Sequence, residues 1–130
     1  MRKNITDDII VLSIGGIIYT SVEYIWRGYS HYTMTIVGSL CFYCLYKIYN
    51  FFDNISLPNA FIIGSLTITA IEFLAGLIIN VNLNMDIWDY SNLKFNFMGQ
   101  VCILYSVLWG FISLIARPIS QKLKLLLSRF

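Results

Sequence analysis

Residues 59–81 read NAFIIGSLTITAIEFLAGLIINV, and this stretch decides the fold. It is apolar over almost its whole length, and Glu72 is its only charged side chain. About 20 apolar residues are needed for a helix to cross the ~30 Å hydrocarbon core of a bilayer. Pro58 stands directly before the stretch, where proline favours the start of a helix. We therefore expect a transmembrane helix over residues 59–81.

Three further apolar stretches accompany it, at about residues 9–26, 33–52 and 97–116. Period-2 alternation is missing from these stretches, and open strand edges cannot sit in lipid, so strands are disfavoured. Pro118 follows the last stretch, where it helps to end a helix. The sequence thus predicts an all-α integral membrane four-helix bundle, formed by residues 1–130 as a single transmembrane domain.

The composition agrees with a surface that faces lipid. Of the 130 residues, 58% are hydrophobic and 12% are charged, and the mean hydropathy is +0.70. Soluble domains are about 45–50% apolar and about 25% charged, so a soluble globule is disfavoured. The formal net charge of +2 gives no support for nucleic acid as a partner. The expected partner is the lipid bilayer.

Basic residues set the expected orientation. They cluster before the first predicted helix and after the last one: Arg2, Lys3, Arg117, Lys122, Lys124 and Arg129. The two loops on the opposite side hold only Arg27 and Lys94. Because cytoplasmic segments carry the excess of Lys and Arg, both termini are expected in the cytoplasm. The basic tail 117–130 is expected either to lie along the anionic inner leaflet or to remain solvated.

Two acidic residues, Glu23 and Glu72, fall within the predicted spans. A carboxylate inside the bilayer costs several kcal/mol and is tolerated mainly beside a partner or a wet cavity. At 1.5 Å per residue, both lie about 20 Å from the inner ends of their helices, in the outer half of the bilayer. Arg27 follows Glu23 by four residues, on the same helix face. The carboxylates either pair structurally with Arg27 or His31, or they line a site open to the outside.

Two polar segments are predicted on the outer side, RGYSH at 27–31 and WDYS at 88–91. Their Trp and Tyr residues are also typical of interfacial anchoring. The candidate substrate- or ion-binding residues are expected to gather on this side: Glu23, Arg27, His31, Glu72, Asn80, Trp88, Asp89, Tyr90 and Ser91. Their spacing matches no metal-site pattern, so no metal and no cofactor is expected.

Motifs for nucleotide and acyl chemistry are missing from the sequence. There is no GxxxxGK[ST] P-loop and no GxSxG elbow. Cys41, Cys44 and Cys102 are expected to act as small hydrophobes, because an odd number of thiols in lipid gives no disulfide framework. An enzyme with His31 as base is the least supported function, since no nucleophile stands out. No catalytic residue is assigned.

The stretch EYIWRGYSH at 23–31 resembles the Glu-x-x-Trp-Arg-Gly-x-x-His element of the ABC-transporter type IV family of small bacterial membrane proteins, also called CmpB-like permeases. Three further segments match in order: Glu72-Phe73 with Gly76 and Asn80, Trp88–Ser91, and Gly99–Cys102 with Ser106 and Trp109. The resemblance covers roughly residues 15–115. It implies a multi-pass permease in the bacterial plasma membrane, of a family that also occurs in phage-like regions.

The predicted inner loop at 53–58 bears on how such a permease would work. An ABC permease docks an ATPase through cytoplasmic elements, and this loop is short for that, so docking would need the termini or a partner subunit. We therefore discount ATP-driven transport. Transporter function as a homo-oligomer is expected, and a dimer is favoured because transport generally uses two structural repeats. The alternative is a non-transporting structural or accessory membrane subunit, perhaps phage-related.

Overall fold

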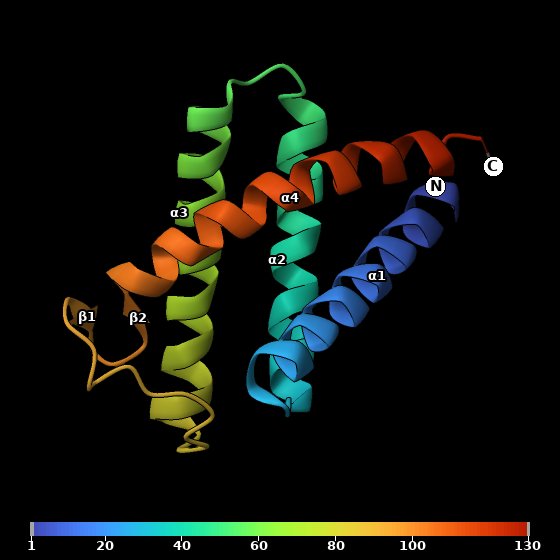
Figure 1. Ribbon diagram of the computed structural model, residues 1–130. Coiled ribbons are helices and arrows are strands. Elements are labelled where there is room, and N and C mark those ends of the chain that lie inside the picture. The colour runs from blue at the N-terminus through green and yellow to red at the C-terminus, as the bar shows by residue number, and fades with distance from the viewer. Residues whose placement is uncertain (1, 130) are drawn as a thin grey trace. The chain divides into compact units, whose positions relative to one another are not determined.

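The computed structural model describes residues 2–129, with side chains from Ile5 onward. Met1 and Phe130, the ends of the predicted domain, lie outside the described residues. Figure 1 shows the α-helices α1 (Arg2–Arg27), α2 (Tyr32–Phe51), α3 (Leu57–Gly76) and α4 (Ile103–Leu127). A π-helical segment, η1 (Leu77–Asn82), continues α3. Two short strands, β1 (Asn96–Phe97) and β2 (Val101–Cys102), pair antiparallel, with Asn96 opposite Cys102.

Three helices are long and apolar enough to cross a membrane, over Ile5–Arg27, Leu57–Asn82 and Ile103–Leu127. The predicted helical architecture is therefore confirmed, with two short strands added to it, and three of the four α-helices have the length and composition of membrane spans. The span predicted over 33–52 corresponds to α2, which falls outside these three. Four tyrosines, Lys47 and a late asparagine lower its hydropathy, although its 20 residues would reach about 30 Å as a helix.

The largest departure from the predicted helix boundaries is at α4. This helix begins at Ile103 instead of residue 97, because Met98 and Gly99 have φ angles of 56° and 73°, which an α-helix excludes. At the other end it runs through Pro118 to Leu127, so most of the predicted tail is helical. Proline inside a helix removes one backbone hydrogen bond, and α4 nevertheless continues for nine residues beyond it, to Leu127.

The chain divides into two compact units, which are described one at a time. Unit 1 contains the chain up to Ile55 and the part from Ile115 onward, and unit 2 is Ser56–Leu114. In unit 1, the ring of Tyr19 on α1 lies against Gly38 on α2, where any side chain would collide with it. Small residues at such positions let helices approach closely in a membrane.

Unit 2 is organised around one face of α3 and η1. Every fourth residue on this face is buried: Ala60, Gly64, Ile68, Glu72, Gly76 and Asn80. The first half of α4 packs beside α3, where Ser65 Oγ donates to the backbone oxygen of Ser106 (2.7 Å) and the ring of Phe61 lies against Gly110. Residues 83–102 connect η1 to α4 and carry most of the predicted outer polar segment.

Candidate functional site

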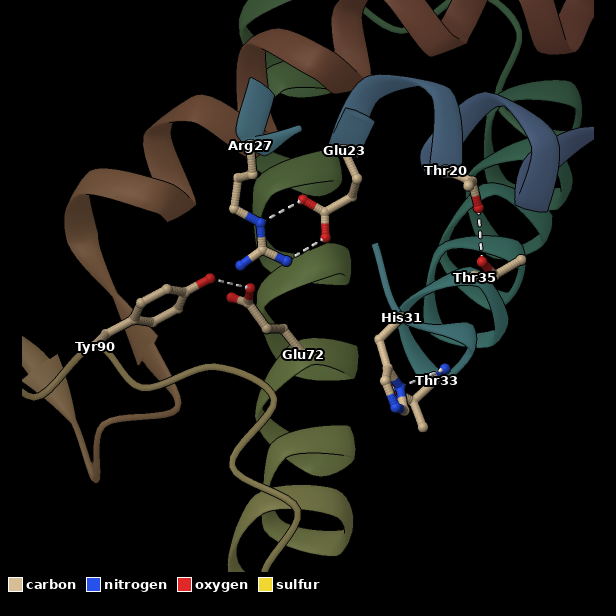
Figure 2. A network of polar contacts seen from close by, with 8 residues as sticks. All are labelled: Thr20, Glu23, Arg27, His31, Thr33, Thr35, Glu72 and Tyr90. Carbon is tan, nitrogen blue, oxygen red and sulfur yellow. Dashed lines mark hydrogen bonds and ion pairs between the residues drawn. The ribbon is translucent and has the colours of Figure 1, made fainter. Parts of the chain in front are cut away.

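The C-terminal end of α1 holds a bidentate ion pair. Arg27 Nε donates to Glu23 Oε2 (3.0 Å) and Arg27 Nη2 donates to Glu23 Oε1 (2.7 Å), as Figure 2 shows. The guanidinium also lies 4.9 Å from the centre of the Tyr29 ring. One turn earlier, Thr20 Oγ1 and Thr35 Oγ1 form a hydrogen bond (2.6 Å) between α1 and α2. The pair expected from the four-residue spacing is therefore formed, and the buried charge of Glu23 has a partner.

His31 begins α2 as its N-terminal capping residue. Its Nδ1 accepts a hydrogen bond from the backbone N–H of Thr33 (3.2 Å) and lies 2.7 Å from Thr33 Oγ1. Its ring packs against Tyr32, with the ring centres 4.4 Å apart. Capping satisfies a backbone donor that the first turn of a helix leaves without a partner. The contacts of His31 within the described residues are thus those of a cap, and a carboxylate is not among them.

Glu72 is the buried acid of unit 2, with a relative exposure of 4%. Each of its carboxylate oxygens accepts one hydrogen bond. Tyr90 Oη donates to Oε2 (2.8 Å; Figure 2), and Trp109 Nε1 donates to Oε1 (3.2 Å). Both donors are neutral aromatic side chains, one from the segment 83–102 and one from α4. Among the described residues, no basic side chain forms an ion pair with Glu72.

Aromatic packing positions these two donors. The ring of Tyr90 stacks on Tyr105 with centres 4.8 Å apart and an interplanar angle of 11°, and Tyr105 lies 6.1 Å from Trp109. The backbone N–H of Tyr90 donates to the carbonyl oxygen of Gly99 (2.7 Å). Because both its ring and its backbone are held, the Tyr90 hydroxyl is oriented toward the carboxylate without depending on that bond alone.

A second polar network surrounds Gln100, which is also buried. Asn80 Nδ2 donates to Gln100 Oε1 (2.9 Å), and Asn80 Oδ1 accepts from the backbone N–H of Ile87 (2.7 Å). The indole of Trp88 donates to the backbone oxygen of Gln100 (3.0 Å). The Gln100 side chain also fills the space beside Gly76. The predicted residues Asn80 and Trp88 are therefore joined through Gln100.

Asp89 and Ser91 form a local turn at the surface of unit 2. Asp89 Oδ1 accepts hydrogen bonds from the hydroxyl and from the backbone N–H of Ser91. These two bonds hold the pKa of Asp89 below its ordinary value. Both side chains are exposed, and Gly99 lies against them with a positive φ. The pair shapes the turn that precedes the hairpin.

The structure thus brings the predicted residues together in small groups. Glu23 joins Arg27 in unit 1, while unit 2 contains Glu72 with Tyr90, Asn80 with Trp88, and Asp89 with Ser91. Sequence reasoning omitted Gln100, Tyr105 and Trp109 from the site. Gln100 and Trp109 stand in the motif of the family resemblance, which was the available signal for them. No group of three or more His, Cys, Asp or Glu that could hold a metal ion occurs among the described residues.

Comparison with known proteins gives one result for the whole chain. The model of the family described as "Putative ABC-transporter type IV" matches residues 10–128. This range extends from the first turns of α1 to the end of α4 and includes all the polar groups above. No curated protein and no solved structure matches the chain.

Proposed function

Because this chain belongs to the ABC-transporter type IV family, we propose that it is a permease-like protein that binds a proton or a small cation from the outer side of the bacterial plasma membrane. Glu72 carries the proposal. It lies within the span Leu57–Asn82 and is almost fully buried, and its hydrogen-bond donors among the described residues are neutral, namely Tyr90 and Trp109. An ionised carboxylate in such a place is costly, and binding a proton or cation removes much of that cost.

The proposal assigns a role to the other polar groups of each unit. In unit 1, Glu23 has Arg27 as its positively charged partner. In unit 2, no described basic side chain forms an ion pair with Glu72, so Glu72 is the carboxylate proposed to take up positive charge. The run 88–91 covers Glu72 through the Tyr90 hydroxyl, and Asn80 fixes the start of that run through Gln100 and Ile87. In this proposal His31 orders the outer turn before α2.

The topology and assembly follow from the same reasoning. We propose that α2 crosses the bilayer as a fourth span. Its 20 residues are enough to cross the hydrocarbon core as a helix, and tyrosine is common at membrane–water interfaces. Both termini are then cytoplasmic, in agreement with the basic residues near each end. A homodimer supplies the two structural repeats that transport generally uses, and a partner subunit is required if an ATPase is to dock.

Flux measurements in liposomes test the function. The purified protein is reconstituted with a pH-sensitive dye inside, and proton uptake and competition by Na⁺ and K⁺ are followed for the parent chain, Glu72→Gln and Glu23→Gln. Asp86→Asn is the matched control, since it removes the same charge at an exposed position. We expect Glu72→Gln to abolish ligand-dependent flux and Asp86→Asn to retain it. Unchanged flux in Glu72→Gln and Glu23→Gln would rule out the proposed site.

One observation favours a second candidate, a non-transporting structural or accessory subunit. Both oxygens of Glu23 accept hydrogen bonds from Arg27, which is the arrangement of a structural ion pair. On this view, Glu23→Gln and Glu72→Gln lower the melting temperature in detergent, and neither changes a flux because the parent chain has none. A parent chain that carries flux in liposomes would exclude this candidate.

A further inference from the structure

Non-helical chain lies against one face of the C-terminal part of α3 and of η1. Within unit 2, the ring of Phe97 on β1 lies 5.4 Å from that of Phe73, and the side chain of Gln100 fills the space beside Gly76. β2 contacts α3, and Figure 1 shows both strands alongside this helix. The hairpin therefore does not extend beyond the end of the span at Asn82 but folds back along it.

The depth of this hairpin follows from helix geometry. The span Leu57–Asn82 has 26 residues, and its midpoint falls between residues 69 and 70. At 1.5 Å per residue, Phe73 lies about 5 Å and Gly76 about 10 Å from that midpoint. The hydrocarbon core extends about 15 Å to each side of the bilayer midplane, and helix tilt brings both residues closer to the midplane. With the span centred, both contacts of the hairpin lie within the hydrocarbon core.

We propose that residues 83–102 form a re-entrant element in the outer half of the bilayer, whose apolar tip contacts lipid acyl chains. The tip consists of Phe95, Phe97 and Met98, which are 76%, 60% and 58% exposed. Five residues after Met98, Ile103 and Leu104 are exposed apolar residues at the start of a helix long and apolar enough to span the membrane. At this depth, lipid acyl chains would contact the exposed apolar surface of the tip. In a loop surrounded by water, the same side chains would remain in contact with solvent, which is unfavourable.

The hydrogen bonding of the hairpin fits an element placed in hydrocarbon. Irregular backbone at membrane depth is tolerated only where its polar groups have partners within the protein or in a wet cavity. Asn96 Oδ1 accepts from the backbone N–H of Gly99 (3.0 Å), and Asn96 Nδ2 donates to the carbonyl of Leu93 (2.8 Å). Gln100 Nε2 donates to the carbonyl of Met98 (3.0 Å). Side-chain amides thus satisfy backbone groups that β1 and β2 leave unpaired.

The backbone angles give a second reason. Phe95 and Met98 have φ angles of 57° and 56°, in the left-handed region that glycine or asparagine normally occupies in aqueous turns. Large apolar side chains at both positions are explained if the turn faces lipid, where their contact with acyl chains offsets the unfavourable backbone. The charged residues of the element, Asp86, Asp89 and Lys94, are all exposed, and they mark the side that water or headgroups reach.

Photocrosslinking tests the proposal with the intact chain in native membranes. p-Benzoylphenylalanine is introduced in place of Phe97 or Phe95, and adducts are identified by mass spectrometry after irradiation. The same group in place of Leu66, an exposed residue within α3, defines the yield expected from a lipid-facing position, and in place of Asp86 it defines the background. We expect lipid adducts at Phe97 within about twofold of those at Leu66. Adducts at background level, or crosslinks to a second copy in their place, would overturn the proposal.

A second measurement remains informative if the photocrosslinking variants fold poorly. Met98→Cys and Asp86→Cys are treated in proteoliposomes with a membrane-impermeant maleimide, and the parent chain with its three native cysteines gives the background. We expect Asp86→Cys to react, and Met98→Cys to react at least tenfold more slowly until detergent is added. Equal reaction rates would contradict the proposal. The proposal does not rest on transport, so the outcome of the Glu72→Gln flux measurement leaves it unaffected.

Discussion

Removing the Tyr90 hydroxyl tests whether the buried carboxylate of Glu72 holds the segment 83–102 on α3. Tyr90→Phe deletes one of the two hydrogen bonds that Glu72 accepts and keeps the ring that stacks on Tyr105. A hydrogen bond to a charged group contributes about 1.5–3 kcal/mol, and the length of 2.8 Å and the burial of Glu72 place this bond in that range. For a chain of this size, each kcal/mol shifts the melting temperature by roughly 3–5 °C. We therefore expect a decrease of roughly 5–15 °C.

The assay is thermal unfolding in detergent, followed by near-ultraviolet circular dichroism. Tyr24→Phe is the matched control, because Tyr24 is exposed on α1, and a change there is expected to stay within about 0.5 kcal/mol. A double-mutant cycle that combines Tyr90→Phe with Glu72→Leu measures the interaction free energy between the two side chains. The reasoning is refuted if Tyr90→Phe shifts the melting temperature no more than Tyr24→Phe does, or if the two changes at Tyr90 and Glu72 add to within about 0.3–0.5 kcal/mol.

Three further predictions concern packing, pH and topology. Gly110→Ala should destabilise the protein by about 1–3 kcal/mol, because the new methyl carbon would lie 2.5 Å from the ring of Phe61; adding Phe61→Leu should restore part of the loss in the same unfolding assay. Hydrogen bonds from the hydroxyl and backbone of Ser91 hold the pKa of Asp89 below its ordinary 3.8, so its contribution to stability is present above that pH and is lost as the pH falls through the lower folded-state value. The melting temperature of Asp89→Asn should accordingly lie below that of the parent chain at pH 6, with a difference that shrinks below pH 3.8; a constant difference would contradict this. If α2 crosses the bilayer, topology reporters inserted after Gly28 and after Asp53 will face opposite sides of the membrane, whereas reporters on one side would show that it does not cross.

Local features of the site could be predicted from the sequence because they depend on helix periodicity. Glu23 and Arg27 are four residues apart on one helix, so their ion pair requires no knowledge of tertiary structure. The apolar stretches likewise indicate helices of membrane length, because transfer free energy depends on composition. The bonds to Glu72 join residues far apart in the sequence, and no local pattern specifies that Trp109 would be one of the donors.

The start of α4 shows the limit of hydropathy. Residues 97–102 are apolar enough to extend the predicted helix, but hydropathy measures the cost of transfer to lipid and not the backbone angles. Asn96 and Gly99 were the available signal, since asparagine followed closely by glycine is typical of turns. The predicted end of the helix at residue 116 was too early, because Pro118, a residue that usually ends a helix, is accommodated within α4.

The aromatic donors of unit 2 also provide a built-in optical probe. Trp88 and Trp109 both have hydrogen-bonded indoles in unit 2, whereas Trp26 is exposed on α1. A Trp26→Phe variant would leave two emitting side chains, one on the segment 83–102 and one beside Glu72. Detachment of that segment from α3 would displace Trp88 and would also remove Tyr90 from the carboxylate that Trp109 contacts. A change in tryptophan emission would therefore report the opening of this part of the protein in real time and without an added label.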